Sequence, residues 1–106
     1  MEKLFAITCN GKSEKSFLDL RFGKCMNLVI FNPSSNQYSI IENPFKEEEN
    51  SGVQLIGLLK ELGVSSIITG EVGPKVNDLL ANERIQLILL SEDKIRINEV
   101  MDRIIP

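Results

Sequence analysis

The order of strand-like and helix-like segments is the feature that most restricts the fold of this chain. Short runs rich in β-branched residues occupy residues 3–9, 27–32, 37–42, 64–69 and 85–90, and apolar residues recur at helical spacing after residues 50 and 74 and around residues 97–104. The uncharged segment 33–36 between the second and third runs is a hairpin signal. A hairpin followed by alternating helices and strands predicts a single α/β domain with a mixed sheet.

Residues that favour the beginnings and ends of helices support these boundaries. Asn50 or Ser51 is expected to cap the first helix, and Gly63 to end it. Pro74 suits the first turn of the second helix. The run at residues 85–90, IQLILL, is almost wholly apolar, which predicts a strand covered on both faces.

Composition excludes several functional classes. The 106 residues suit one domain spanning residues 1–106, and the absence of histidine rules out Ser-His-Asp and Cys-His catalysis and His-ligated zinc. A net charge of −3 argues against a nucleic-acid partner. The N-terminal segment does not resemble a secretory signal, and no apolar run is long enough for a membrane helix, so we expect a cytoplasmic protein.

Two loops are expected at the carboxyl edge of the sheet, where ligands of open α/β sheets usually bind. The first loop spans residues 10–25 and the second spans residues 70–75. In the first loop, Arg21 and Lys24 could present cationic donors to an anion, and the second leads into a helix N-terminus. A solvated loop pair and a tight strand-to-helix connection are the plainer alternatives.

The two cysteines are candidate ligands for a thiophilic metal. Cys25 lies beside Lys24 and near Arg21, and such cations lower a thiol's pKa and favour the metal-binding thiolate. Cys9 ends the first strand and could be its spatial neighbour. Two thiolates cannot complete a four-cysteine cluster site, so a shared, externally ligated or transferable cluster would be required. Alternatively, Cys9 is a small core residue and Cys25 a half-buried loop residue.

The same segments resemble the dinitrogenase iron-molybdenum cofactor biosynthesis (NifX/NifB-type) domain family. The matching segments are DLRFGKC at residues 19–25, ENP at 42–44, GVQ at 52–54, LGV at 62–64 and IITGEVGPK at 67–75, in an order that extends from about residue 3 to residue 103. The resemblance implies a ribonuclease H-like, three-layer α/β/α fold with a five-stranded mixed sheet of order 3-2-1-4-5. Family members that handle the nitrogenase cofactor often have a histidine where this chain has Arg21, which shifts the predicted metal ligands to Cys25 and Cys9.

The resemblance also implies a non-enzymatic carrier or store of an iron–sulfur or iron–molybdenum cofactor precursor. The predicted cofactor-binding residues are Arg21, Phe22, Gly23, Lys24, Cys25, Gly70 and Gly73. Expected partners are the cluster and its donor or acceptor proteins, with the chain a monomer or weak homodimer. A cluster-free interaction or regulatory domain is the alternative. Nuclease activity is not expected, because the first strand lacks the carboxylates that two-metal nucleases need.

Overall fold

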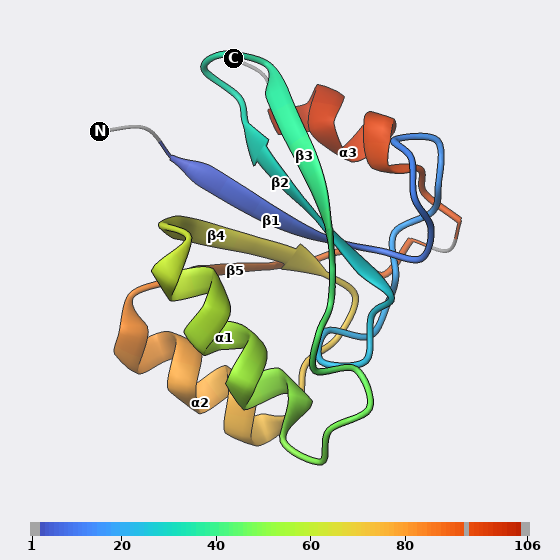
Figure 1. The fold of residues 1–106 in the computed structure, drawn as a ribbon. Helices are drawn as coiled ribbons and strands as arrows, with labels where there is room; N and C mark the ends of the chain where they lie inside the picture. The colour runs from blue at the N-terminus through green and yellow to red at the C-terminus, as the bar shows by residue number, and fades with distance from the viewer. Residues whose placement is uncertain (1–2, 93, 105–106) are drawn as a thin grey trace.

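A computed structural model describes residues 3–92 and 94–104, so Met1 and Glu2 of the N-terminal segment considered above lie outside it. The described residues form β1 (Leu4–Cys9), β2 (Asn27–Asn32), β3 (Gln37–Glu42), α1 (Ser51–Glu61), β4 (Val64–Thr69), α2 (Pro74–Glu83), β5 (Gln86–Leu89) and α3 (Ile97–Ile104) (Figure 1). None of these helices has the length and apolar character needed to cross a membrane.

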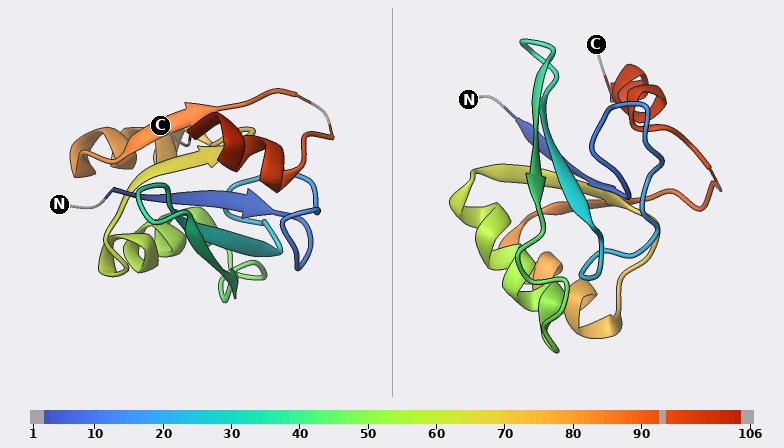
Figure 2. Two further views of the ribbon diagram at one scale, coloured as in Figure 1. Left: turned by 90° about the horizontal axis from the view of Figure 1, so that it is seen from above. Right: turned by 45° about the vertical axis from the view of Figure 1, so that its right-hand side comes forward.

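The strands form one mixed sheet in the order β3-β2-β1-β4-β5. The central strand β1 pairs antiparallel with β2 and parallel with β4. Helices α1 and α2 cover one face and α3 covers the other, which gives three layers (Figures 1 and 2). The predicted fold and strand order are therefore confirmed.

Each face of the sheet has its own apolar cluster. Ala6 of β1 packs on the α1 and α2 side with Leu55 and Leu59, whereas Ile7 packs on the α3 side with Val100. This division follows from the alternation of side chains along a strand. The two clusters together bury the carboxyl-terminal four residues of β1, which gives the loops at that end of the strand a rigid base.

Most of the predicted boundaries are confirmed, but the predicted environment of the last strand is wrong. Gly63 has a φ of +81° just after the C-cap of α1, and α2 begins at Pro74, as expected. Asn50 is the N-cap residue of α1, as expected, although its side chain makes no capping hydrogen bond. Strand β5 is an edge strand whose Leu89 is 52% exposed, so the prediction of cover on both faces is wrong. Its apolar pattern could not distinguish a central strand from an edge strand.

Candidate functional site

The first loop crosses the carboxyl ends of β1 and β4. The Asp19 amide donates to the Thr8 carbonyl at 2.9 Å, and the Glu71 amide donates to the Leu20 carbonyl at 2.8 Å. A Cβ atom on Gly70 would lie 2.6 Å from the Leu20 Cα, so this close approach of two backbones requires glycine. The prediction that the two loops meet at one edge of the sheet is confirmed.

A pocket of about 480 Å³ opens beside this junction, on the α1 and α2 side. The first loop supplies Arg21, Phe22, Gly23 and Lys24, helix α1 supplies Ser51 and Gly52, and the second loop with α2 supplies Glu71, Val72, Gly73 and Val76. Of the predicted cofactor-binding residues, all but Cys25 and Gly70 line this pocket. Gly70 instead holds the first loop against the second, and a Cβ on Gly73 would meet no atom within 4 Å.

The N-termini of both long helices border the pocket. Ser51 is the first residue of α1, and Gly73 is the N-cap of α2. Neither helix has a side-chain hydrogen bond at its cap. The first amides of a helix lack intrahelical partners and carry the positive end of the helix dipole. Two such ends at one pocket favour a bound anion.

Two exposed cations add to this positive character. The Arg21 side chain is 63% exposed, and its Nε lies 3.4 Å from Oδ1 of the buried Asp19. Lys24 donates from Nζ to the backbone carbonyl of Glu48 at 2.6 Å, a neutral partner that does not cancel its charge. Among the described residues that line the pocket, Glu71 is the one acid. The donor groups therefore suit an anion with several acceptor atoms.

Cys25 lies beneath this pocket and does not open into it. The residue is fully buried among Phe22, Leu28 and Leu55. Burial, and to a smaller extent the negative charge of Asp19, raises the pKa of the Cys25 thiol from 9.0 to about 12. The predicted exposed, low-pKa thiolate is therefore wrong, because the neighbouring cations extend into solvent while the sulfur faces the core.

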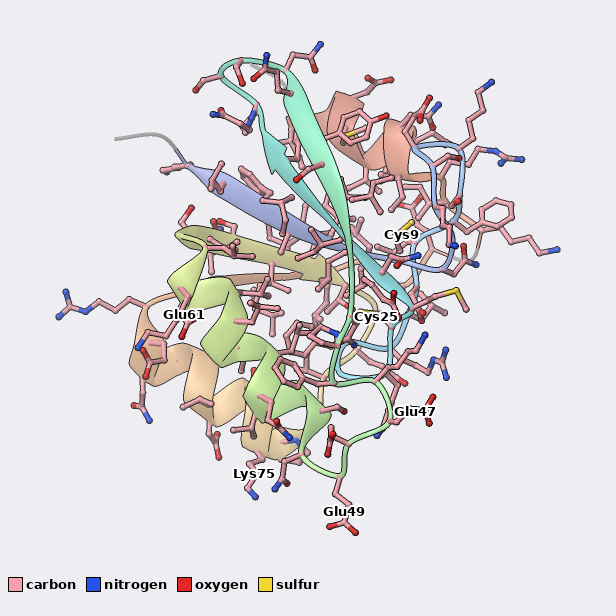
Figure 3. All side chains as sticks on the ribbon, in the orientation of Figure 1. Cys9, Cys25, Glu47, Glu49, Glu61 and Lys75 are labelled. Carbon is pink, nitrogen blue, oxygen red and sulfur yellow. The ribbon has the colours of Figure 1, made fainter. Side chains whose placement is uncertain are left out.

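Cys9 lies on the other face of the sheet. It belongs to the α3-side cluster, whereas Cys25 belongs to the cluster under α1 and α2 (Figure 3). The Cys9 thiol donates to the Gly11 carbonyl at 3.3 Å, and burial raises its pKa. The two cysteines, which were expected to be possible neighbours in one site, therefore pack in separate apolar clusters on opposite faces of the sheet. Within residues 3–92 and 94–104, no group of three or more His, Cys, Asp or Glu side chains is arranged to hold a metal ion.

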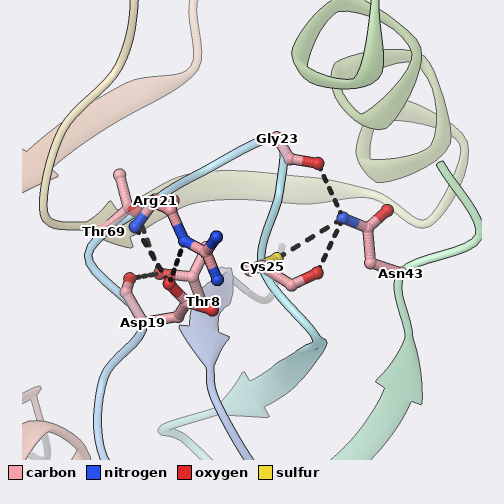
Figure 4. A network of polar contacts seen from close by, with 7 residues as sticks. All are labelled: Thr8, Asp19, Arg21, Gly23, Cys25, Asn43 and Thr69. Carbon is pink, nitrogen blue, oxygen red and sulfur yellow. Dashed lines mark hydrogen bonds and ion pairs between the residues drawn. The ribbon is translucent and has the colours of Figure 1, made fainter. Parts of the chain in front are cut away.

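Asn43 fixes the first loop and was not among the predicted site residues. Its Nδ2 donates to the Gly23 carbonyl at 2.9 Å and to the Cys25 carbonyl at 3.0 Å, and lies 3.6 Å from the Cys25 sulfur (Figure 4). Its Oδ1 accepts from the Phe45 amide at 3.0 Å. The available sequence signal was an Asn-Pro pair after a strand, which is typical of a side-chain-stabilised turn. The N-terminal residues of α1 were also missed, since they were interpreted only as a helix start.

These groups fit one kind of metal cluster and not another. The pocket surface offers no thiolate to a cluster that needs protein sulfur ligands, because Cys9 and Cys25 are both buried. An anionic cluster that already carries its own ligands finds two cations and two helix N-termini. The donor set therefore suits electrostatic binding of a complete anion rather than covalent assembly.

The fold and the pocket define the chain as a small α/β domain with a pocket at the carboxyl edge of its sheet, lined by two cations and two helix N-termini. The chain belongs to the dinitrogenase iron-molybdenum cofactor family, whose model matches residues 3–105. It is similar in structure to the apo form of the orange protein from Desulfovibrio gigas, with a TM-score of 0.87, 21% identity, and coverage of 98% of this chain and 88% of that one. A candidate NifB protein from Thermotoga gives a TM-score of 0.80 with 20% identity, covering 96% and 86% of the two chains. Among curated proteins, none matches the sequence.

Proposed function

We propose that this protein is a non-enzymatic carrier of an anionic metal–sulfur cluster, such as an iron–sulfur or iron–molybdenum cofactor precursor. The observation that carries the proposal is the convergence of two uncapped helix N-termini with Arg21 and Lys24 on one pocket. Membership in a family named for the iron–molybdenum cofactor supports a metal–sulfur anion as the ligand.

In this proposal the cluster arrives with its ligands and is held mainly by charge. Arg21 and Lys24 approach it from the first loop. The first turns of α1 and α2 border the same pocket, and their unpaired amides would donate to the cluster, except at Pro74, which has no N–H. Such interactions are screened by salt and form without bond exchange, which suits a protein that must release its cargo. Gly73 leaves the space beside the second helix open to a bulky ligand.

A second binding mode is direct ligation by Cys25 after the first loop opens. Cys25 directly follows Lys24, which lines the pocket. The Cys25 amide donates to the Phe22 carbonyl at 3.4 Å, which is a long hydrogen bond. This mode requires the loop to leave Asn43 and the thiol to lose its proton. Ligation by Cys9 would require a separate opening on the α3 side.

The test uses an iron–sulfide cluster preformed with small thiolate ligands and added without oxygen. We expect the wild-type protein to retain the cluster's visible absorbance through gel filtration at low salt and to lose it as salt rises. The variant Arg21→Gln/Lys24→Gln removes both pocket cations, and Lys12→Gln/Lys15→Gln makes the same charge change at exposed positions on the α3 side.

The comparison of the two variants separates the outcomes. The proposal predicts at least a tenfold weaker retention for the pocket variant, and retention close to wild type for the control variant. Equal loss in both variants would show that only net charge matters. Absence of binding to the wild type would favour a cluster-free interaction domain instead.

A further inference from the structure

The outer edge of β3 is an unprotected strand edge. Strand β3 ends the sheet, and all six of its residues pair with β2 in an unbroken register (Figure 2). No other strand within the described residues pairs with it. Every second residue of β3 therefore directs its backbone N–H and C=O away from β2, where another extended chain could pair with them.

This edge lacks the features that usually prevent such pairing. Strand β3 contains no proline, lysine or arginine and no bulge, and the adjacent turn at residues 33–36 is uncharged. The opposite edge, β5, is only four residues long. Glu42, at the end of β3, is the one charged residue of the strand, and long edges with so little charge are those that natural proteins usually block.

The side chains of β3 are also left partly uncovered. Tyr38 is 41% exposed, and Ile40 and Ile41 are half-buried although they contribute to the two apolar clusters. A hollow of about 280 Å³ lies beside the strand, lined by Leu4 and Ile30 among others. An added strand would cover these apolar groups as well as pair the backbone.

We infer that β3 pairs antiparallel with β3 of a second copy, which would extend the sheet across two molecules. The two-fold axis would pass through Ser39 of both copies. Directly opposite residues of antiparallel strands point to the same face of the sheet, so the α3-side faces of the two sheets would form one continuous face. In that register Tyr38 faces Ile40 of the second copy, and Gln37 faces Ile41 beside the hollow. Aromatic and β-branched pairs stabilise antiparallel strands, and no like charges lie opposite each other.

The test is the mass of the protein in solution over a concentration series, with variants at two exposed serines. Ser39→Lys places two positive charges together at the proposed axis, whereas Ser35→Lys adds the same charge in the hairpin turn. We expect the wild type and Ser35→Lys to approach twice the monomer mass at high concentration. Ser39→Lys should stay monomeric, and mixing it with Ser39→Glu should restore the dimer.

Three results would overturn the inference. These are a wild type that stays monomeric at millimolar concentration, a dimer that Ser39→Lys does not weaken, and a dimer that both lysine variants weaken equally. No residue of β3 lines the pocket that contains Arg21 and Lys24, so failure of this test leaves the proposed binding site for the metal cluster unaffected. Conversely, loss of cluster binding in the pocket variant does not affect dimerisation.

Discussion

Residues 21–25 combine two opposite environments within one short turn. Arg21 and Lys24 extend into solvent at the wall of the pocket, whereas Phe22 and Cys25 are buried against the cluster under α1 and α2. Arg21 and Lys24 form the exposed rim of the pocket, whose positive charge can attract an anion. Phe22 and Cys25 form the buried floor, which anchors the loop. The comparison shows that a cysteine beside two cations in the sequence need not be activated by them, because side-chain direction decides which group the thiol meets.

The largest expected effect concerns the residue that holds the floor in place. Replacing Asn43 with alanine removes hydrogen bonds to two loop carbonyls and leaves a small void. We expect a loss of about 2–4 kcal/mol in the free energy of unfolding, measured by urea denaturation. The matched change Asn82→Ala, on the exposed surface of α2, should stay within about 0.5 kcal/mol. Equal losses for the two variants would contradict a clamp at Asn43.

Two glycines at the pocket sharpen the same comparison. A Cβ on Gly23 would lie 2.6 Å from both the Gly52 amide nitrogen and the Ser51 Oγ, whereas a Cβ on Gly73 would meet nothing within 4 Å. Gly23→Ala should therefore cost about 1–3 kcal/mol of stability, and Gly73→Ala should cost less than about 0.5 kcal/mol. If thermal unfolding shows the two variants to be equally stable, the close packing of the first loop on α1 is incorrect.

The buried thiol predicts a dependence of stability on high pH. The pKa of Cys25 is raised from 9.0 to about 12, so between these pH values the unfolded chain releases a proton that the native chain retains. Stability from this group is fully present below pH 9 and declines toward pH 12, with a slope of at most about 1.4 kcal/mol per pH unit. Cys25→Ala should be less stable at neutral pH but should show a flatter decline above pH 9. An unchanged slope would mean that the thiol ionises in the native state.

The smallest effect on stability is expected at the rim. Arg21→Gln/Lys24→Gln removes charges from exposed side chains, so the free energy of unfolding should change by less than about 1 kcal/mol. Circular dichroism during thermal unfolding would measure this change. A loss as large as that of the Asn43 variant would show that the rim cations are structural.

The sequence was sufficient to predict the strands, the helices and the meeting of the two loops. Periodicity identifies the elements, and the carboxyl ends of parallel strands must share an edge. Because side chains alternate along a strand, Cys9 lies on the same face of β1 as Ile7 and on the opposite face from Ala6. The inward direction of Cys25 could not be predicted, because an irregular loop has no periodicity and its clamp, Asn43, is distant in the sequence.

The central claim is that the rim, and not the sulfur, holds the cargo. Native mass spectrometry without oxygen, after adding an iron–sulfide cluster preformed with small thiolates, would test it on the variants Cys25→Ala and Arg21→Gln/Lys24→Gln. We expect Cys25→Ala to retain the mass of the intact cluster with all its small thiolates, and the Arg21→Gln/Lys24→Gln variant not to retain it. The opposite result, with cluster retained by the rim variant, lost from Cys25→Ala and bound to the wild type with one thiolate displaced, would contradict it.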